Sequence, residues 1–61
     1  MTERSSQLLS ALETARGPLS GPQLSELLQV STRSIRKYVR EINRRAAQEL
    51  VQADHRGYVL D

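Results

Sequence analysis

The 61-residue chain has no cysteine, no tryptophan and no phenylalanine. Without cysteine, neither a disulfide framework nor a thiolate metal site can form, which excludes a disulfide-stabilised secreted domain and a zinc finger. A chain of this length buries only about 60% of the surface that its unfolded form exposes. We therefore expect residues 1–61 to form one small domain that is held by packing alone and is too small for most enzyme clefts.

Long apolar runs are also missing. The longest one, Tyr58-Val59-Leu60, is far shorter than the ~20 residues that a membrane helix needs. No apolar stretch follows the first four residues, as a signal peptide would require, so we expect a cytoplasmic protein without a membrane partner. The hydrophobic share of 38% and the charged share of 26% are ordinary for a folded domain and argue against a disordered tail.

The sequence also lacks the motifs of catalysis and cofactor binding. It contains no Walker-type phosphate loop, no dinucleotide fingerprint and no cluster of metal ligands. The single histidine, His55, has no second ligand, and we interpret it as an exposed turn residue. The serines have no second histidine or buried acid as a partner, so we expect them to cap helices and form turns. These absences predict a protein that is not an enzyme and has no catalytic residue, metal or cofactor.

The charges that are present divide the chain unevenly. Between Ser31 and Arg45 there are six basic residues and one acid, Glu41, a local balance of +5. The rest of the chain has three basic residues and six acids, a balance of −3, and the sum gives the net charge of +2. One segment is therefore suited to bind an anion. Its basic residues are Arg33, Arg36, Lys37, Arg40, Arg44 and Arg45.

Helical spacing of apolar residues predicts a first helix over roughly Ser5 to Arg16. Thr2, Ser5 and Ser6 can each cap its start. Gly17 is expected to end it in a left-handed conformation, and Pro18 blocks its continuation.

A second, short helix is predicted after an extended segment at Leu19. Ser20 as N-cap and Gln23 three residues later form a capping box, Pro22 is tolerated in the first turn, and the helix should stop near Gln29. Its apolar face is expected to consist of Leu24, Leu27 and Leu28.

A third helix is predicted over about residues 31–45, with Ser31 as its N-cap. At about 100° per residue, its side chains separate into two opposite faces, with Tyr38 at the border of the apolar one. The apolar face holds Ile35, Val39, Ile42 and Ala46, and the basic face holds Arg33, Lys37, Arg40 and Arg44.

After Leu50 the apolar period changes from 3.6 to 2, which predicts a short β-hairpin. Val51 and Ala53 alternate before the turn, and Tyr58 and Leu60 alternate after it. The turn runs from Asp54 to Gly57, and Gly57 can adopt a positive φ without steric cost.

A short helix, a tight turn and a second helix with a basic outer face constitute the helix-turn-helix arrangement. Such a helix fits the major groove of DNA, where an arginine can bind guanine through two hydrogen bonds and its neighbours neutralise phosphates. A hairpin that follows would place Arg56 at its tip beside the DNA backbone. The expected fold is therefore α+β, a winged helix-turn-helix with three helices and a C-terminal two-stranded wing.

Two stretches of the chain also resemble a known family: LLSALETARGPLSGPQLSELLQVSTRSIRKYVREIN and RGYVL. They are similar to the winged helix-turn-helix domains at the N-termini of biotin-operon-repressor-like regulators and of sugar-operon regulators and antiterminators controlled by the phosphotransferase system. The chain departs from that pattern at three positions. Ser25 replaces a small alanine, Gln29 replaces a glycine in the turn, and Gly57 stands where relatives often have two glycines.

The resemblance implies sequence-specific binding of double-stranded DNA in transcriptional control, in a bacterial regulator. In that family, the residues matching Thr32, Arg33, Arg36 and Lys37 lie at the DNA, and those matching Tyr58 and Leu60 anchor the wing. We expect the chain to be the N-terminal part of a longer regulator that acts as a homodimer. The expected DNA-binding residues are Ser31, Thr32, Arg33, Ser34, Arg36, Lys37, Arg40, Arg44 and Arg56.

Three other interpretations are considered. In the first, the basic face of the third helix is the solvated side of an ordinary surface helix. That face lacks the acidic partners that such helices use. In the second, the winged helix is a protein-interaction or dimerisation module, whose binding would depend on an exposed apolar patch. The third makes RNA the ligand, which is disfavoured because the major groove of A-form RNA is too narrow for a helix.

Overall fold

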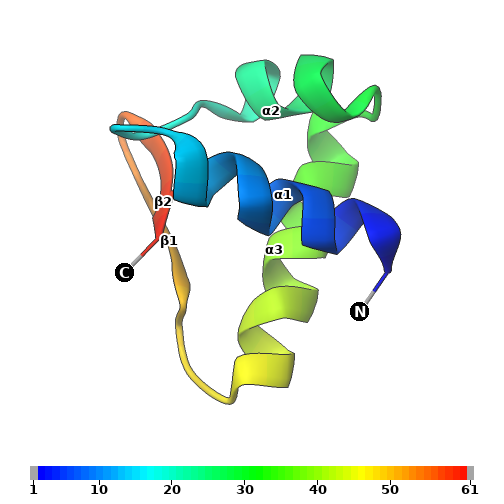
Figure 1. Ribbon diagram of the computed structural model, residues 1–61, viewed down its shortest axis with the longest axis vertical. Coiled ribbons are helices and arrows are strands. Elements are labelled where there is room, and N and C mark those ends of the chain that lie inside the picture. Colours follow the sequence, from blue (N-terminus) through cyan, green and yellow to red (C-terminus); the bar gives the residue numbers. More distant parts are fainter. Residues whose placement is uncertain (1, 61) are drawn as a thin grey trace.

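The computed structural model describes residues 2–60 as three helices followed by a two-stranded antiparallel sheet (Figure 1). In Figure 1, α1 crosses in front of α3, α2 lies above both, and the hairpin runs along the opposite side from the N-terminus. The predicted α+β winged helix-turn-helix is confirmed. The elements are α1 (Glu3–Thr14), α2 (Gly21–Leu28), α3 (Thr32–Ala46), β1 (Val51–Asp54) and β2 (Gly57–Leu60).

The first helix begins and ends two residues earlier than predicted. Thr2 is the N-cap, and its hydroxyl accepts a hydrogen bond from the amide of Ser5 at 3.2 Å. Ser5 itself is fully buried inside the first turn. At the other end, Ala15 is already extended, with a ψ of 144°. The prediction that Gly17 ends the helix with a positive φ is wrong, because the chain has left the helix before it reaches that residue.

The capping box of α2 is confirmed. The Ser20 hydroxyl accepts from the amide of Gln23 at 3.2 Å, and the Gln23 side chain accepts from the amide of Ser20 at 2.8 Å. Gln29 follows the helix with φ 60° and ψ 45°, a left-handed conformation at the position where the resembled family has a glycine. The Ser25 hydroxyl donates a hydrogen bond to the carbonyl of Val30, which ties the turn to the helix before it.

Helix α3 is capped by Ser31, whose hydroxyl accepts from the amide of Ser34 at 3.1 Å. It ends at Ala46, one residue beyond the expected boundary, and Ala47 adopts a left-handed conformation with φ 57°.

No helix among the described residues is long and apolar enough to cross a bilayer.

The hairpin pairs with an extended residue between α1 and α2. Within the hairpin, Val51 lies opposite Leu60 and Ala53 lies opposite Tyr58. The amide of Tyr58 donates to the carbonyl of Leu19 at 2.8 Å, and the amide of Leu19 donates to the carbonyl of Tyr58 at 3.1 Å. This bridge confirms the extended segment predicted at Leu19 and fixes the wing to the helices.

The core is aliphatic and is shared by all three helices and β1. Leu27 was expected on the apolar face of α2, but its side chain is 62% exposed. That expectation is wrong because α1 and α3 cover only one side of this short helix, and Leu24 and Leu28 occupy that side. The buried residues are Leu8, Leu12, Leu24, Leu28, Ile35, Ile42 and Val51.

Candidate nucleic-acid interface

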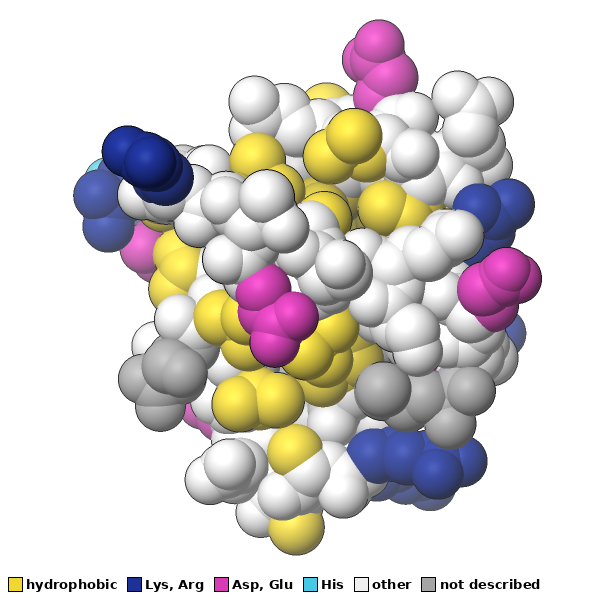
Figure 2. Space-filling view, in the orientation of Figure 1, with side chains coloured by type: hydrophobic (Ala, Val, Ile, Leu, Met, Phe, Trp, Pro, Cys, Tyr) yellow, Lys and Arg dark blue, Asp and Glu magenta, His cyan; other side chains and the backbone are white. Residues whose placement is uncertain are grey.

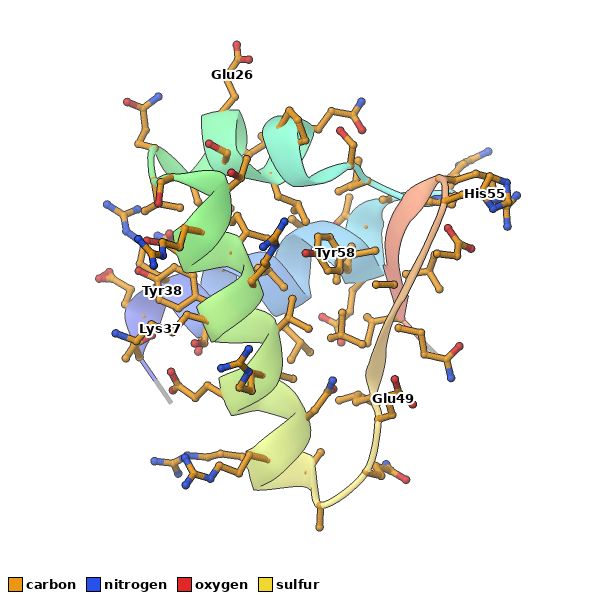
Figure 3. The ribbon with its side chains drawn as sticks, turned by 180° about the vertical axis from the view of Figure 1, so that it is seen from behind. Glu26, Lys37, Tyr38, Glu49, His55 and Tyr58 are labelled. Carbon is orange, nitrogen blue, oxygen red and sulfur yellow. The ribbon has the colours of Figure 1, made fainter. Side chains whose placement is uncertain are left out.

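The outer face of α3 is basic along its whole length. Four residues three or four positions apart, here called the basic stripe, are all exposed: Arg33, Lys37, Arg40 and Arg44. None of them has an ion-pair partner within residues 2–60. Figure 3, seen from behind, shows Lys37 on one side of α3 and the hairpin on the other. The stripe therefore presents a row of free cations to solvent.

A depression of about 610 Å³ lies on this face, around the first two and a half turns of α3. Arg44 is outside it, in the last turn of the helix. The geometry thus separates the arginines near the start of α3 from Arg44. The lining residues are Arg33, Ser34, Arg36, Lys37 and Arg40.

The hydroxyl groups at the start of α3 differ in what they contact. Ser31 accepts from the Ser34 amide, and the two serine hydroxyls lie 3.2 Å apart. Thr32 is exposed, whereas Ser34 is half-buried. Ser31 and Ser34 therefore stabilise the helix start, and Thr32 is left facing solvent.

The turn of the wing is held by Asp54. Its Oδ1 accepts from the amide of Arg56 at 2.8 Å and from the amide of Gly57 at 3.2 Å. The Arg56 guanidinium lies 3.5 Å from Oδ2. The hydrogen bond from the Arg56 amide, more than the nearby guanidinium and the Gly57 amide, lowers the pKa of Asp54 below its ordinary value of 3.8. The Arg56 side chain is 64% exposed and stays accessible.

A second hollow of about 420 Å³, the wing cleft, lies between the hairpin tip and the starts of α2 and α3. Thr32 and Arg36 line it from α3, and His55 and Arg56 line it from the hairpin. Because Arg36 is offset from Arg33 by roughly 60° around the helix axis, it lines both hollows. The predicted site residues of α3 and of the wing therefore meet at Arg36.

The position of the wing relative to α3 depends on Asn43. Its amide nitrogen donates to the carbonyl of Val51 at 3.0 Å, and its side-chain oxygen accepts from the amide of Val51 at 2.8 Å. Asn43 is not among the site residues predicted from the sequence. An asparagine inside a helix has a low helix propensity, which is the only local signal that it has another role.

A basic residue from the α1–α2 connection also lies at the wing. Arg16 is exposed and lines a hollow of about 260 Å³ together with Pro18 and Arg56. Figure 2 shows Lys and Arg side chains beside the single histidine at this edge of the molecule. Arg16 is not among the site residues predicted from the sequence, because only the pairing of Leu19 with Tyr58 brings it close to Arg56.

An apolar groove of about 630 Å³ runs between α1 and α2. Leu27 and Leu28 line it from α2, Ala11 lines it from α1, and Ala15 lines it from just after α1. Figure 2 shows apolar side chains exposed there, on the face opposite to the one seen in Figure 3. The apolar and basic surfaces are thus separate. Within residues 2–60, no three His, Asp or Glu side chains lie together as metal ligands would.

Comparison with known proteins agrees with this geometry. No curated protein matches the sequence. A sequence model described as "HTH domain" matches residues 4–59, a range that contains most of α1, all of α2, α3 and β1, and most of β2. Helix-turn-helix domains act as DNA-binding units in transcription regulation. The chain therefore belongs to the helix-turn-helix domain family, and its general role is DNA binding in transcription regulation.

Proposed function

We propose that the chain binds double-stranded DNA in a sequence-specific manner, with the first turns of α3 in the major groove and the wing against the backbone. The observation that carries the proposal is the basic stripe, whose cations are exposed and have no ion-pair partner within residues 2–60. A helix of about 10–12 Å in diameter fits a major groove of about 12 Å. Cations without protein partners gain most from neutralising phosphates.

Each residue has a distinct role in this proposal. Arg33, at the start of α3, reaches base edges, since an arginine pairs with guanine through two hydrogen bonds. Lys37 and Arg40 neutralise phosphates or contact bases one turn further along. Arg36 and Thr32 face the DNA where the groove passes the wing. Arg44 adds only a phosphate contact from the last turn.

The wing adds backbone contacts beside α3. Arg56 is exposed at the hairpin tip, and its pairing with Asp54 is an exposed interaction of small energy that a phosphate can replace. Arg16 lies close enough to share this role. Ser31 and Ser34 support the interface indirectly, by holding the start of α3.

We extend the proposal to a dimeric regulator of the biotin-operon-repressor-like or phosphotransferase-system-controlled type, with residues 1–61 as its N-terminal DNA-binding domain. One module of this size buries only roughly 600 to 1,000 Å² on DNA, which predicts weak binding. Two copies on a two-fold symmetric site would supply the missing affinity and sequence information.

Fluorescence anisotropy with a short random-sequence duplex tests the central claim. We expect affinity to fall as salt rises, with a slope of log affinity against log salt of at most about −5 for six phosphate contacts per copy. An Arg33→Ala/Lys37→Ala variant should lose most of this binding. An Arg4→Ala/Arg45→Ala variant carries the same charge change at two arginines that are not members of the stripe and should retain it.

Two results would contradict the proposal. A slope near zero would show that phosphate neutralisation contributes nothing. Equal losses in the two double variants would show that net charge, and not the stripe, controls binding. If alanine substitutions on the stripe do not change binding, and a Leu27→Ala substitution instead abolishes binding to a partner protein, the protein-interaction alternative is supported.

A further inference from the structure

The hairpin tip presents an ionisable side chain that the proposed contacts do not use. His55 and Arg56 are the two residues between β1 and β2, and both are exposed. The tip is held in place from both sides, by the hydrogen bonds of Asp54 and by the pairing of Tyr58 with Leu19. His55 is therefore presented at a defined position on the molecule, as Figure 3 shows.

The side chain of His55 belongs to the same surface as the start of α3. It lines the wing cleft together with Thr32 and Arg36. A phosphate placed between the wing and α3 would contact Arg36 from one wall and His55 from the other. We infer that His55 is a DNA-contacting residue whose protonated form strengthens binding, so that DNA affinity rises as the pH falls; this inference rests on the proposed function.

The charges around His55 determine the direction of the effect. From α3, Arg36 faces the cleft; from the hairpin, Asp54, Arg56 and the phenol of Tyr58 do. From the α1–α2 connection, Arg16 lines the neighbouring hollow together with Arg56. The lining part of α2, residues 20–22, has no charged side chain. A protonated imidazole adds a positive charge beside a DNA phosphate, so the DNA-bound state favours the charged form of the side chain.

Binding and proton uptake are then linked. Histidine is the side chain type whose charge changes between about pH 5 and pH 8. His55 is the only histidine of the chain, and there is no cysteine that could titrate in the same range. One added phosphate contact should steepen the salt slope by about 0.9 and raise affinity on the order of fivefold at moderate salt.

Three proteins test the inference: the wild type, a His55→Gln variant that cannot be charged, and a His55→Lys variant that stays charged. All three are titrated with the same short duplex, labelled with a dye that does not titrate, at about pH 5.5 and about pH 8. We expect the wild type to match His55→Gln at the higher pH and to approach His55→Lys at the lower pH. Circular dichroism verifies that each variant is folded.

The outcomes separate this inference from the function on which it rests. If the three proteins bind DNA with salt-sensitive affinity but the wild type and His55→Gln have the same pH profile, His55 does not contact DNA and the inference is wrong. If none of them binds in a salt-sensitive way at either pH, the proposed function fails and the role of His55 fails with it. A pH response that His55→Gln abolishes supports both.

Discussion

At the scale of single residues, three positive φ angles set the path of the backbone. Gln29 and Ala47 adopt left-handed conformations after α2 and α3, with φ of 60° and 57°. Each costs on the order of 1 kcal/mol relative to glycine. Gly57 has a φ of 135°, a region that side-chain-bearing residues rarely adopt. It is the position where the wing meets Leu19.

Gly57→Ala should destabilise the fold by about 2 kcal/mol or more. An added Cβ would lie 2.5 Å from the carbonyl oxygen of Leu19 and 2.7 Å from its carbon, and neither backbone atom can move without breaking the pairing with Tyr58. Urea denaturation measures the loss. Gly17→Ala is the matched control, because nothing lies within 4 Å of an added Cβ there and its φ is not positive. Equal effects of the two substitutions would contradict this account.

Asp54 should make stability depend on pH in the acid range. Its folded-state pKa is lowered, chiefly by the hydrogen bond from the Arg56 amide, so the ionised carboxylate favours the folded state. This contribution is complete above the ordinary value of 3.8 and is lost as the pH falls through the lower, folded-state value. The wild type should therefore be more stable than Asp54→Asn at neutral pH and lose that advantage in strong acid. A difference in urea-unfolding free energy that stays constant with pH would rule out this role.

At the scale of elements, α2 shows where a periodic pattern misleads. Leu24, Leu27 and Leu28 have helical spacing, yet only Leu24 and Leu28 are buried, at 0% and 4% exposure. A helix of eight residues is stabilised by its neighbours and buries only the side that they cover. The spacing identifies an apolar helix but not which of adjacent leucines faces the core.

Leu24→Ala should cost about 2–5 kcal/mol, because it empties a fully buried site. Leu27→Ala should cost less than about 1 kcal/mol, because most of that side chain already contacts water. The two variants remove the same atoms from the same helix, so chemical denaturation compares burial alone. A large loss for Leu27→Ala would show that the apolar groove between α1 and α2 is closed in solution.

The junction between α3 and β1 depends on one side chain. Asn43→Ala removes two hydrogen bonds to Val51. The backbone amide and carbonyl of Val51 then lose these two partners. We expect a loss of about 1–3 kcal/mol and faster hydrogen exchange at the Val51 amide. Gln48→Ala, at an exposed position just after the same helix, should change neither quantity. Unchanged exchange in Asn43→Ala would mean that the wing is held by its other contacts.

The features that the sequence predicted correctly are local ones. Capping at Ser20 and Ser31 involves residues within three positions of each other, and the turn before Gly57 is equally short-range. The site residues that it missed depend on contacts between different elements. Asn43 bonds to a strand, and Arg16 approaches Arg56 only after the hairpin has docked. A sequence pattern does not give the orientation that brings the partners of such a pair together.

At the scale of the whole molecule, the apolar groove between α1 and α2 and the hollow at the start of the basic stripe have no lining residue in common. Figure 2 shows apolar side chains gathered near the centre of the view and Lys and Arg side chains around its rim. The start of α3 and the wing share the wing cleft, and the end of α3 lies away from it. The predicted site residues of α3 are therefore not equivalent. Those near the helix start line a hollow, and Arg44 lies outside it.

This arrangement predicts different losses for two arginines of the basic stripe. Arg33→Ala should relax base preference by about 1–3 kcal/mol at one position of the preferred site. Arg44→Ala should weaken binding to all sequences alike and reduce the salt slope by about 1. Selection of preferred duplexes from a random pool, followed by titration of single-base variants, distinguishes the two. An unchanged preference in Arg33→Ala would remove that residue from the base-reading set.

The bridge between Leu19 and Tyr58 also has a kinetic consequence. Its two residues are separated by the whole of α2 and α3, so the pairing forms only after a long chain loop has closed. Contacts of this kind develop late in folding, after helices α2 and α3 have met through their short turn. The wing should therefore be absent from the folding transition state. Weakening the bridge would then accelerate unfolding while leaving the refolding rate nearly unchanged.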